Sequence, residues 1–377
     1  MLVLQDREKR FGLFMAPIDS EIRRLQNDEL GELTEFLHCA YPGEVRKANL
    51  RYLHWYYLQN PNADGHGVPV WVVRSGGKIV GQLATIPVNL KIGMAYTKAI
   101  WILEFILLGE FRGKGLGKRL VLAAREKYPT MITLGINEAS TRVFTSLGWK
   151  PLGSIHRYHK LLFPGSAIRG LSDKGLLRGG VNWLSFPLRI SLGRAKSTSR
   201  YEIRRDRVLG HELDELWERA SAQWPVAVRR KHGFVAWQFL RQPGKIFEII
   251  RVYEQERLVG YAILFFRKGI GNGPSSKAAI SDLVYDSRNQ DEVIAALLDA
   301  ALKLAIERKA GSLVTDVLDA RVEARLKSFG FWRIKNSPRF MASSAEFQEI
   351  LYKPENWYLT RADSDVSIFE EPNVVET

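Results

Sequence analysis

Aromatic, proline and glycine landmarks recur in this chain at one fixed spacing. Three pairs of identical residues are each separated by 182 positions: Trp55 and Trp237, Pro61 and Pro243, and Gly148 and Gly330. The elements expected around them follow the same order, from a helix and an aromatic-rich helix through paired strands to an amphipathic helix, a strand and a short helix. A repeat of this length indicates two copies of one domain rather than a solenoid of short units.

Length and composition agree with a globular protein of two to three domains. The chain has 377 residues, of which 46% are hydrophobic and 25% charged. Cys39 is the only cysteine, which excludes an intrachain disulfide and a cysteine zinc cluster. Charged residues begin at Asp6, close to the first residue of the chain. No run approaches the roughly 20 apolar residues that span a bilayer. We therefore expect no signal peptide and no transmembrane segment, and a cytoplasmic location by default.

The formal net charge of +14 admits three interpretations. A positive field suits a polyanionic cofactor or an acidic substrate, and this interpretation ranks first. A solvated basic surface ranks second. Nucleic-acid binding ranks last, because the chain has no helix-turn-helix signature, no zinc finger and no RNA-binding aromatic motif. No nucleic-acid partner is expected.

A glycine-rich basic loop lies between an apolar strand and an amphipathic helix. The strand covers residues 102–108, the loop covers 112–117, and the helix places Leu116, Leu120, Val121 and Ala124 on one face. Glycines let a ligand approach the backbone, and the free N–H groups of a helix N-terminus favour an anion. The loop is neither a dinucleotide fingerprint, because Lys118 stands at the third glycine position, nor a Walker loop, because Arg119 follows Lys118.

What fits is R-x-x-G-x-G, formed by Arg112, Gly115 and Gly117. In this setting it resembles the coenzyme-A pyrophosphate loop of the GNAT acetyltransferase superfamily. Downstream, a strand over 131–136, Asn137, a helix over 139–147 and a closing Gly-Trp pair resemble that family's N-x₆-Y-x₃-G-F motif, with Phe144 in place of its tyrosine. An ordinary β-α-β unit with a glycine turn is the alternative.

The resemblance implies an α/β fold: two tandem GNAT-like domains, each a central mixed sheet flanked by helices. It implies acetyl-coenzyme A as co-substrate and an acyltransferase, with an amine or hydroxyl acceptor that is a small molecule or is linked to a glycan. The overall pattern is also loosely similar to GNAT-like proteins of bacterial polysaccharide pathways, which adds amino sugars as candidates. The implied cofactor-binding residues are Ile106, Leu107, Leu108, Arg112, Gly113, Lys114, Gly115, Leu116, Gly117, Lys118 and Asn137.

Acyl transfer to an ammonium acceptor needs a base, and Glu104 is the only carboxylate in the central strand. Partial burial would raise its pKa toward a useful value; the alternative is that it only orders water or binds substrate. Phe144 cannot protonate the departing thiolate, so Tyr158 is the predicted replacement, with His156 and His159 beside it. These histidines lack a clear third ligand, and no metal site is predicted.

We predict four segments: a GNAT domain over 1–163, a basic connector over 164–200, a degenerate GNAT-like domain over 201–345 and a tail over 346–377. The connector carries seven basic residues against one acidic. An ordered linker is the simpler interpretation, and contact with an anionic membrane surface is the alternative. Between Asp286 and Val293 the second copy lacks the glycines and carries carboxylates, so we expect it not to bind coenzyme A.

Two further alternatives stay open. The tail either docks as a strand or folds back to present Asp363 and Asp365 to an amine substrate. The whole protein, instead of catalysing transfer, can be a non-catalytic sensor or scaffold that binds acyl-coenzyme A. The absent tyrosine favours the sensor, whereas the intact loop and Glu104 favour the enzyme.

Overall fold

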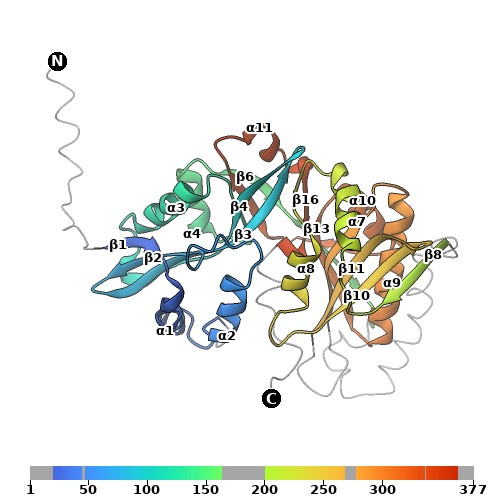
Figure 1. Ribbon diagram of the computed structural model, residues 1–377, viewed down its shortest axis with the longest axis horizontal. Coiled ribbons are helices and arrows are strands. Elements are labelled where there is room, and N and C mark those ends of the chain that lie inside the picture. Colours follow the sequence, from blue (N-terminus) through green and yellow to red (C-terminus); the bar gives the residue numbers. More distant parts are fainter. Residues whose placement is uncertain (1–19, 45–46, 164–199, 268–276, 336, 364–377) are drawn as a thin grey trace.

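A computed structural model describes residues 20–44, 47–163, 200–267, 277–335 and 337–363. Of the predicted connector at 164–200 only Arg200 is described, so the connector, and with it the membrane alternative, lies outside the described residues, as does Asp365. We call residues 20–163 the first half and residues 200–363 the second half. Figure 1 shows the two halves side by side, blue to green and yellow to orange, with the red strand β16 between them.

The first half contains the elements that the hydrophobic patterns predicted, but the central strand predicted over 102–108 begins seven residues earlier, at Ala95. The aromatic-rich helix is a short α-helix that continues as a π-helical turn. The elements are β1 (Glu21–Arg24), η1 (Asn27–Glu29), α1 (Leu30–Ala40), α2 (Leu50–Leu53), η2 (His54–Leu58), β2 (Val70–Ser75), β3 (Lys78–Ile92), β4 (Ala95–Leu107), η3 (Gly109–Phe111), α3 (Leu116–Lys127), β5 (Met131–Leu134), α4 (Glu138–Ser146), β6 (Lys150–Ser154) and β7 (His156–Leu161).

The second half has a similar succession of elements, with one additional strand, β9, between its first two helices, and then adds a C-terminal segment. Its elements are β8 (Tyr201–Arg205), α7 (Glu212–Ala220), η6 (Ser221–Gln223), β9 (Val226–Val228), α8 (His232–Phe239), β10 (Phe247–Glu254), β11 (Arg257–Arg267), β12 (Lys277–Tyr285), α9 (Gln290–Glu307), β13 (Ser312–Leu318), α10 (Ala320–Ser328), β14 (Trp332–Ile334), β15 (Arg339–Ser343), α11 (Gln348–Leu351), η7 (Pro354–Asn356), β16 (Trp357–Thr360) and η8 (Arg361–Asp363).

The strands join in one continuous mixed sheet. In the first half, antiparallel β1 to β4 lead to β5, which runs parallel to β4. In the second half, β8, β10, β11 and β12 form the same antiparallel order, and β13 runs parallel to β12. Strands β9 and β16 connect the halves, because β9 pairs with β3, β16 pairs with β9, and β16 also pairs with β13.

The two halves exchange one strand each. Strand β15, from the second half, lies between β5 and β6 of the first. Strand β7, from the first half, lies between β13 and β14 of the second. The hydrophobic cores follow the exchange, because Tyr158 belongs to the second-half core and Phe340 to the first-half core. The predicted boundaries at 163 and 201 did not anticipate this, and a cut between them would remove an interior strand from each half.

The strands β4 and β5 are paired over only part of their length. Their register covers Ile100 to Ile102 against Met131 to Thr133, and β5 is then paired on its other side with β15. Beyond Ile102, β4 stays paired with β3 up to Leu107. The edge of β4 that faces β5 therefore has no strand partner over residues 103–107 within the described part of the sheet, and only the Leu107 carbonyl is engaged there, by the Arg112 side chain.

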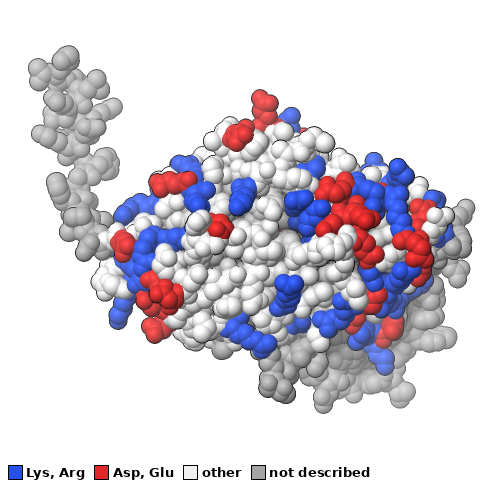
Figure 2. Space-filling view, in the orientation of Figure 1, with Lys and Arg blue, Asp and Glu red and all other residues white. Residues whose placement is uncertain are grey.

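Acidic and basic side chains are interspersed at both ends of the face that Figure 2 shows, and the area between them is mostly uncharged with a few basic side chains. This visible face carries no continuous basic stripe of the kind that follows a nucleic-acid backbone. Among the described residues, none of the helices combines the length and the apolar character needed to cross a membrane.

Candidate active site

A cavity of about 720 Å³ opens where β4 and β5 separate, at the N-terminus of α3. It brings together most of the predicted cofactor residues, but not Leu108 or Lys114. The predicted residues that line it are Ile106, Leu107, Arg112, Gly113, Gly115, Leu116, Gly117, Lys118 and Asn137. Leu108 instead donates its N–H to the Val80 carbonyl at 3.0 Å, which continues the pairing with β3.

The loop glycines serve two different purposes. Gly113 and Gly115 have φ near +76°, a left-handed conformation that favours glycine, and a side chain at either position would meet no neighbour within 4 Å. Gly117 lies inside the first turn of α3, where an added Cβ would come within 2.8 Å of the Phe105 ring. The first two glycines therefore shape the loop, and the third lets α3 pack closely against β4.

A side-chain contact fixes the position of the loop 112–117 beside the cavity. The Arg112 guanidinium donates from Nε to the Leu107 carbonyl at 2.8 Å, which ties the loop to the end of β4. The N–H groups in the first turn of α3 have no acceptor within the helix, so the helix N-terminus presents donors and the positive end of its dipole. Exposed Lys118 adds positive charge beside them. This arrangement suits a diphosphate.

The opposite wall comes from α4, which the sequence analysis did not assign to the site. Ala139, Ser140 and Val143 line the cavity, as does Tyr41 at the end of α1. Asn137 starts α4 by accepting a hydrogen bond from the Ser140 N–H at 2.8 Å. The three α4 positions share one helix face, and that spacing was the available signal.

Phe144 is fully buried behind the cavity wall. Its ring packs against Phe105 at a centroid distance of 5.5 Å and against Trp149 at 4.7 Å. The residue at the family's tyrosine position therefore contributes packing, and its ring has no hydroxyl to offer.

Glu104 is buried on the sheet face that α2 covers. Its Oε1 lies 3.0 Å from the Lys47 ammonium, and its Oε2 accepts a hydrogen bond from Gln82 at 3.1 Å. Burial raises the pKa of Glu104, while Lys47 and Gln82 oppose this by favouring the carboxylate. Lys47 also lies 3.8 Å above the Tyr41 ring, so the ion pair adjoins the cavity wall.

The second half holds a group of the same design. Glu104 follows a β-bulge that leaves Leu103 unopposed in the register of β3 and β4. Asp282 follows the equivalent bulge, which leaves Ser281 unopposed between β11 and β12. Each carboxylate stands directly after an irregularity at the same place in its sheet.

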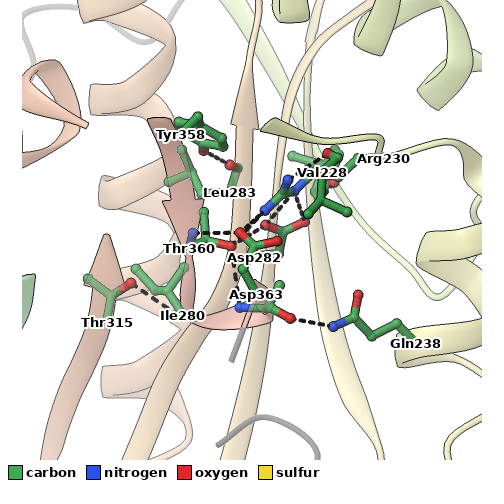
Figure 3. A network of polar contacts seen from close by, with 12 residues as sticks. Val228, Arg230, Gln238, Ile280, Asp282, Leu283, Thr315, Tyr358, Thr360 and Asp363 are labelled. Atoms are coloured by element: carbon green, nitrogen blue, oxygen red, sulfur yellow. Dashed lines mark hydrogen bonds and ion pairs between the residues drawn. The ribbon is translucent and has the colours of Figure 1, made fainter. Parts of the chain in front are cut away.

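The partners correspond as well. Asp282 is paired with Arg230 at 3.1 Å and accepts a hydrogen bond from the Tyr261 hydroxyl at 2.8 Å. These two groups take the places that Lys47 and Gln82 occupy around Glu104. Figure 3 shows Arg230, Asp282, Thr360 and Asp363 converging on one buried point.

In the second half, the space beside Asp282 is occupied by the protein's own strand β16. Strand β16 enters where β12 and β13 separate, pairing with β13 at Val317 and Leu318. The Thr360 hydroxyl donates to Asp282 at 2.7 Å, and Asp363 accepts hydrogen bonds from Arg230 and from the Thr360 N–H. Asp363 is thus buried in an ion pair, so its carboxylate is not presented to a substrate as one alternative had it.

The loop before α9 contains a carboxylate that is paired with side chains of the same protein. The buried Asp286 carboxylate accepts hydrogen bonds from Arg219 at 2.8 Å and Arg257 at 2.7 Å. A carboxylate with two guanidinium partners therefore stands near the end of β12, where the first half has its glycine loop and cavity.

Tyr158 does not reach the cavity, contrary to the role expected for it. Its strand, β7, has moved to the second-half sheet, where its hydroxyl donates to Glu323 at 2.8 Å. Burial and this contact raise the pKa of Tyr158 well above its ordinary value, which makes it a poorer acid. On the same strand, His156 bonds to Glu323 at 2.8 Å and His159 packs edge-on against Trp332.

Comparisons with known proteins give a family match over the segment that builds this cavity. The profile of the acetyltransferase (GNAT) family matches residues 30–149, and a search of curated protein sequences found no significant match. Among solved structures, the chain is similar to a GCN5-related N-acetyltransferase from Anabaena variabilis (14% identity, TM-score 0.58, covering 86% of this chain and 72% of that one).

Two further structures extend the likeness. One is a probable N-acyltransferase from Enterococcus faecalis (14% identity, TM-score 0.58, 89% and 75% covered), and the other is N-myristoyltransferase from Saccharomyces cerevisiae (12% identity, TM-score 0.56, 86% and 80% covered). At such identities these likenesses show the fold alone. The matched profile identifies residues 30–149 as a domain of the acetyltransferase (GNAT) family, which supports an acyltransferase.

Proposed function

We propose that this protein transfers an acyl group, with acetyl from acetyl-coenzyme A as the first candidate, to an amine or hydroxyl acceptor. The acceptor class is a small molecule or a glycan-linked group, amino sugars included. The observation that carries the proposal is the cavity of about 720 Å³, which joins the glycine loop, the N-terminus of α3 and the free edge of β4. In it the diphosphate would meet the loop, and the pantetheine arm would meet the unpaired groups of residues 103–107.

The chemistry follows from these groups. The acceptor nitrogen or oxygen attacks the thioester carbon, and the carbonyl oxygen becomes an oxyanion that a main-chain N–H of the free β4 edge can stabilise. Collapse breaks the carbon–sulfur bond and releases the thiolate. A thiol has a pKa of about 8.5, so this leaving group needs little protonation near neutral pH, which fits the absence of a hydroxyl at Phe144.

Glu104 is the proposed acceptor of the proton that the nucleophile loses. Because Glu104 is already paired with Lys47, the proton would reach it through movement of Lys47 or through a bridging water. We expect Glu104→Gln to lower kcat by 10²–10⁴-fold with unchanged coenzyme-A affinity. Tyr158→Phe should leave kcat unaltered. Equal losses in both variants would contradict this assignment of the base.

We further propose that the halves arose by tandem duplication and that only the first binds coenzyme A. The matching carboxylates Glu104 and Asp282, each after an equivalent bulge, support the duplication. Strand β16 and Asp286 support the closure of the second half. Titration calorimetry on the full chain should give one coenzyme A per chain, and binding should be lost when Gly115→Trp blocks the loop. Two sites per chain, or one site that survives Gly115→Trp, would contradict it.

The second candidate function is a sensor that binds acyl-coenzyme A without turning it over. The specific observation in its favour is that an ion pair equivalent to Lys47–Glu104 occurs in the second half, where β16 leaves no room for a substrate. Such a pair can therefore serve the fold alone. Thiol release from acetyl-coenzyme A should be followed against a panel of amines, alcohols and amino sugars. Tight binding with no release above the hydrolysis background for every acceptor would favour the sensor.

A further inference from the structure

Two histidines and an aspartate meet in the second half, away from the cavity. His211 is the N-cap residue of α7, Asp214 lies in the first turn of that helix, and His232 begins α8. Ligand atoms from all three lie within 4.8 Å of one another. The sequence carried the signal only in part, because His211 and Asp214 are three residues apart whereas His232 comes from another helix.

The Asp214 carboxylate is oriented by the protein before any ligand binds. Its Oδ1 accepts the His232 main-chain N–H at 2.7 Å and so caps α8. Its Oδ2 faces both imidazoles, at 2.9 Å from His232 Nδ1 and 3.6 Å from His211 Nδ1. One oxygen is thereby fixed by the backbone, and the other is directed at two ring nitrogens.

These separations match those within a zinc site. Ligands about 2.0–2.1 Å from a tetrahedral zinc ion lie about 3.3 Å from each other, between the two distances found here. The two imidazole rings are already close, with centroids 4.2 Å apart. Asp214 Oδ2 and His211 Nδ1 lie 3.6 Å apart, which is too far for a hydrogen bond. A metal ion between these two atoms could instead bind both.

Charge and exposure also suit a cation. Two helix N-termini point here, and their positive dipole ends are offset by Asp214 and Glu215 in the first turn of α7, while Glu212 in the same turn is paired with Arg251. The His211 side chain is 86% exposed, whereas Asp214 is 23% exposed. Solvent can therefore reach the open side of the cluster and supply the fourth ligand.

We propose that His211, Asp214 and His232 form a binding site for a divalent transition-metal ion, with zinc as the chemically preferred occupant. Two imidazoles and one carboxylate are a donor set that zinc, cobalt and nickel accept. The ion would clamp the N-terminus of α7 to that of α8. Helix α8 also carries Trp237, which contacts Trp55 of the first half, so the clamp would stabilise the helix that joins the halves.

The test is metal titration of the full-length protein after treatment with a chelator. Calorimetry with zinc should give one site per chain with a dissociation constant in the micromolar range or below. Cobalt should produce the visible absorption of a tetrahedral site, and zinc should raise the melting temperature. We expect His211→Ala to weaken binding at least tenfold. Asp214→Asn should do the same, because asparagine can still cap α8 while lacking the charged ligand.

Two controls separate this site from unspecific binding. His38→Ala removes an exposed histidine on α1 and should leave zinc affinity unchanged. The variants' melting temperatures without zinc show whether each protein is folded. The proposal is overturned if the folded wild type takes up no stoichiometric zinc, or if its zinc affinity is the same in His211→Ala and Asp214→Asn as in His38→Ala.

Discussion

Trp55 and Trp237 donate their indole N–H groups to each other's main-chain carbonyls. The distances are 3.0 and 3.1 Å, the rings stack at a centroid distance of 5.3 Å, and both side chains are almost fully buried. Two residues that stand 182 positions apart are therefore partners in a reciprocal contact. This is the relationship expected at a local two-fold axis between two similar units.

The reciprocal contact leads to the first prediction. Trp55→Phe removes the indole donor of the Trp237 carbonyl, and Trp237→Phe removes one of the two donors of the Trp55 carbonyl, which keeps the Gln59 N–H at 3.3 Å. We expect each change to cost about 1–3 kcal/mol, with the larger cost for Trp55→Phe. Urea unfolding of the single and double variants measures the coupling. We expect the double variant to differ from the sum of the single ones by at least about 0.5 kcal/mol, because the residues touch. Trp332→Phe, on the surface, is the control, and strict additivity would contradict the contact.

The second prediction concerns the packing of α3 on β4. In Gly117→Ala the added Cβ would press on the Phe105 ring, which must move toward the cavity that it lines. We expect about tenfold weaker coenzyme-A binding by calorimetry and a loss of about 1–3 kcal/mol in stability. Gly109→Ala is the matched control, since a Cβ there meets nothing within 4 Å. If both variants bind equally well, Gly117 is not a packing position.

The third prediction uses the ion pair at Glu104. Burial raises the pKa of Glu104, and the Lys47 ammonium holds it down. Lys47→Met removes that restraint, so the pKa of Glu104 should rise further. A base must be ionised, so activity falls as pH drops through its pKa. The acid limb of the kcat/KM profile should therefore move to higher pH. Lys98→Met, at an exposed position of β4, should not move it, and an unmoved limb in Lys47→Met would exclude Glu104 as the base.

The fourth prediction concerns acid stability. The side-chain hydrogen bond from Arg23 lowers the pKa of Glu29 from 4.5 to about 2, against the opposing effect of burial. A depressed acid pKa adds stability above its unfolded value of 4.5, and this is lost as pH falls from 4.5 toward 2. Glu29→Gln should cost about 2 kcal/mol at pH 7, and most of this cost should disappear near pH 2, where the carboxylate is about half protonated. Denaturant unfolding at several pH values checks this.

Exposed Glu35 supplies the comparison for that experiment. Glu35→Gln should leave the unfolding free energy within about 0.5 kcal/mol of wild type at every pH. If Glu29→Gln follows the same course, the Arg23–Glu29 contact contributes no net stability.

The sequence alone determined the local parts of this protein. The apolar periods at α3, α9, β5 and β13 were readable because burial on one face imposes a period of 3.6 or 2. The loop from Arg112 to Gly117 was readable because its glycines and its place before a helix suit an anion. The cavity collects most of the predicted loop and β4 residues for this reason, since they are neighbours in sequence.

Tertiary structure decided what depends on distant pairing. No local pattern shows that β7 and β15 would exchange sheets, because a strand's alternation fits either partner, and so Tyr158 was assigned to the wrong neighbourhood. The joining of Lys47 to Glu104 and the filling of the second half by β16 likewise depend on contacts between segments far apart in the chain. The hydrophobic pattern of a helix or strand predicts which of its faces is buried. Only the folded chain shows which other segment covers that face.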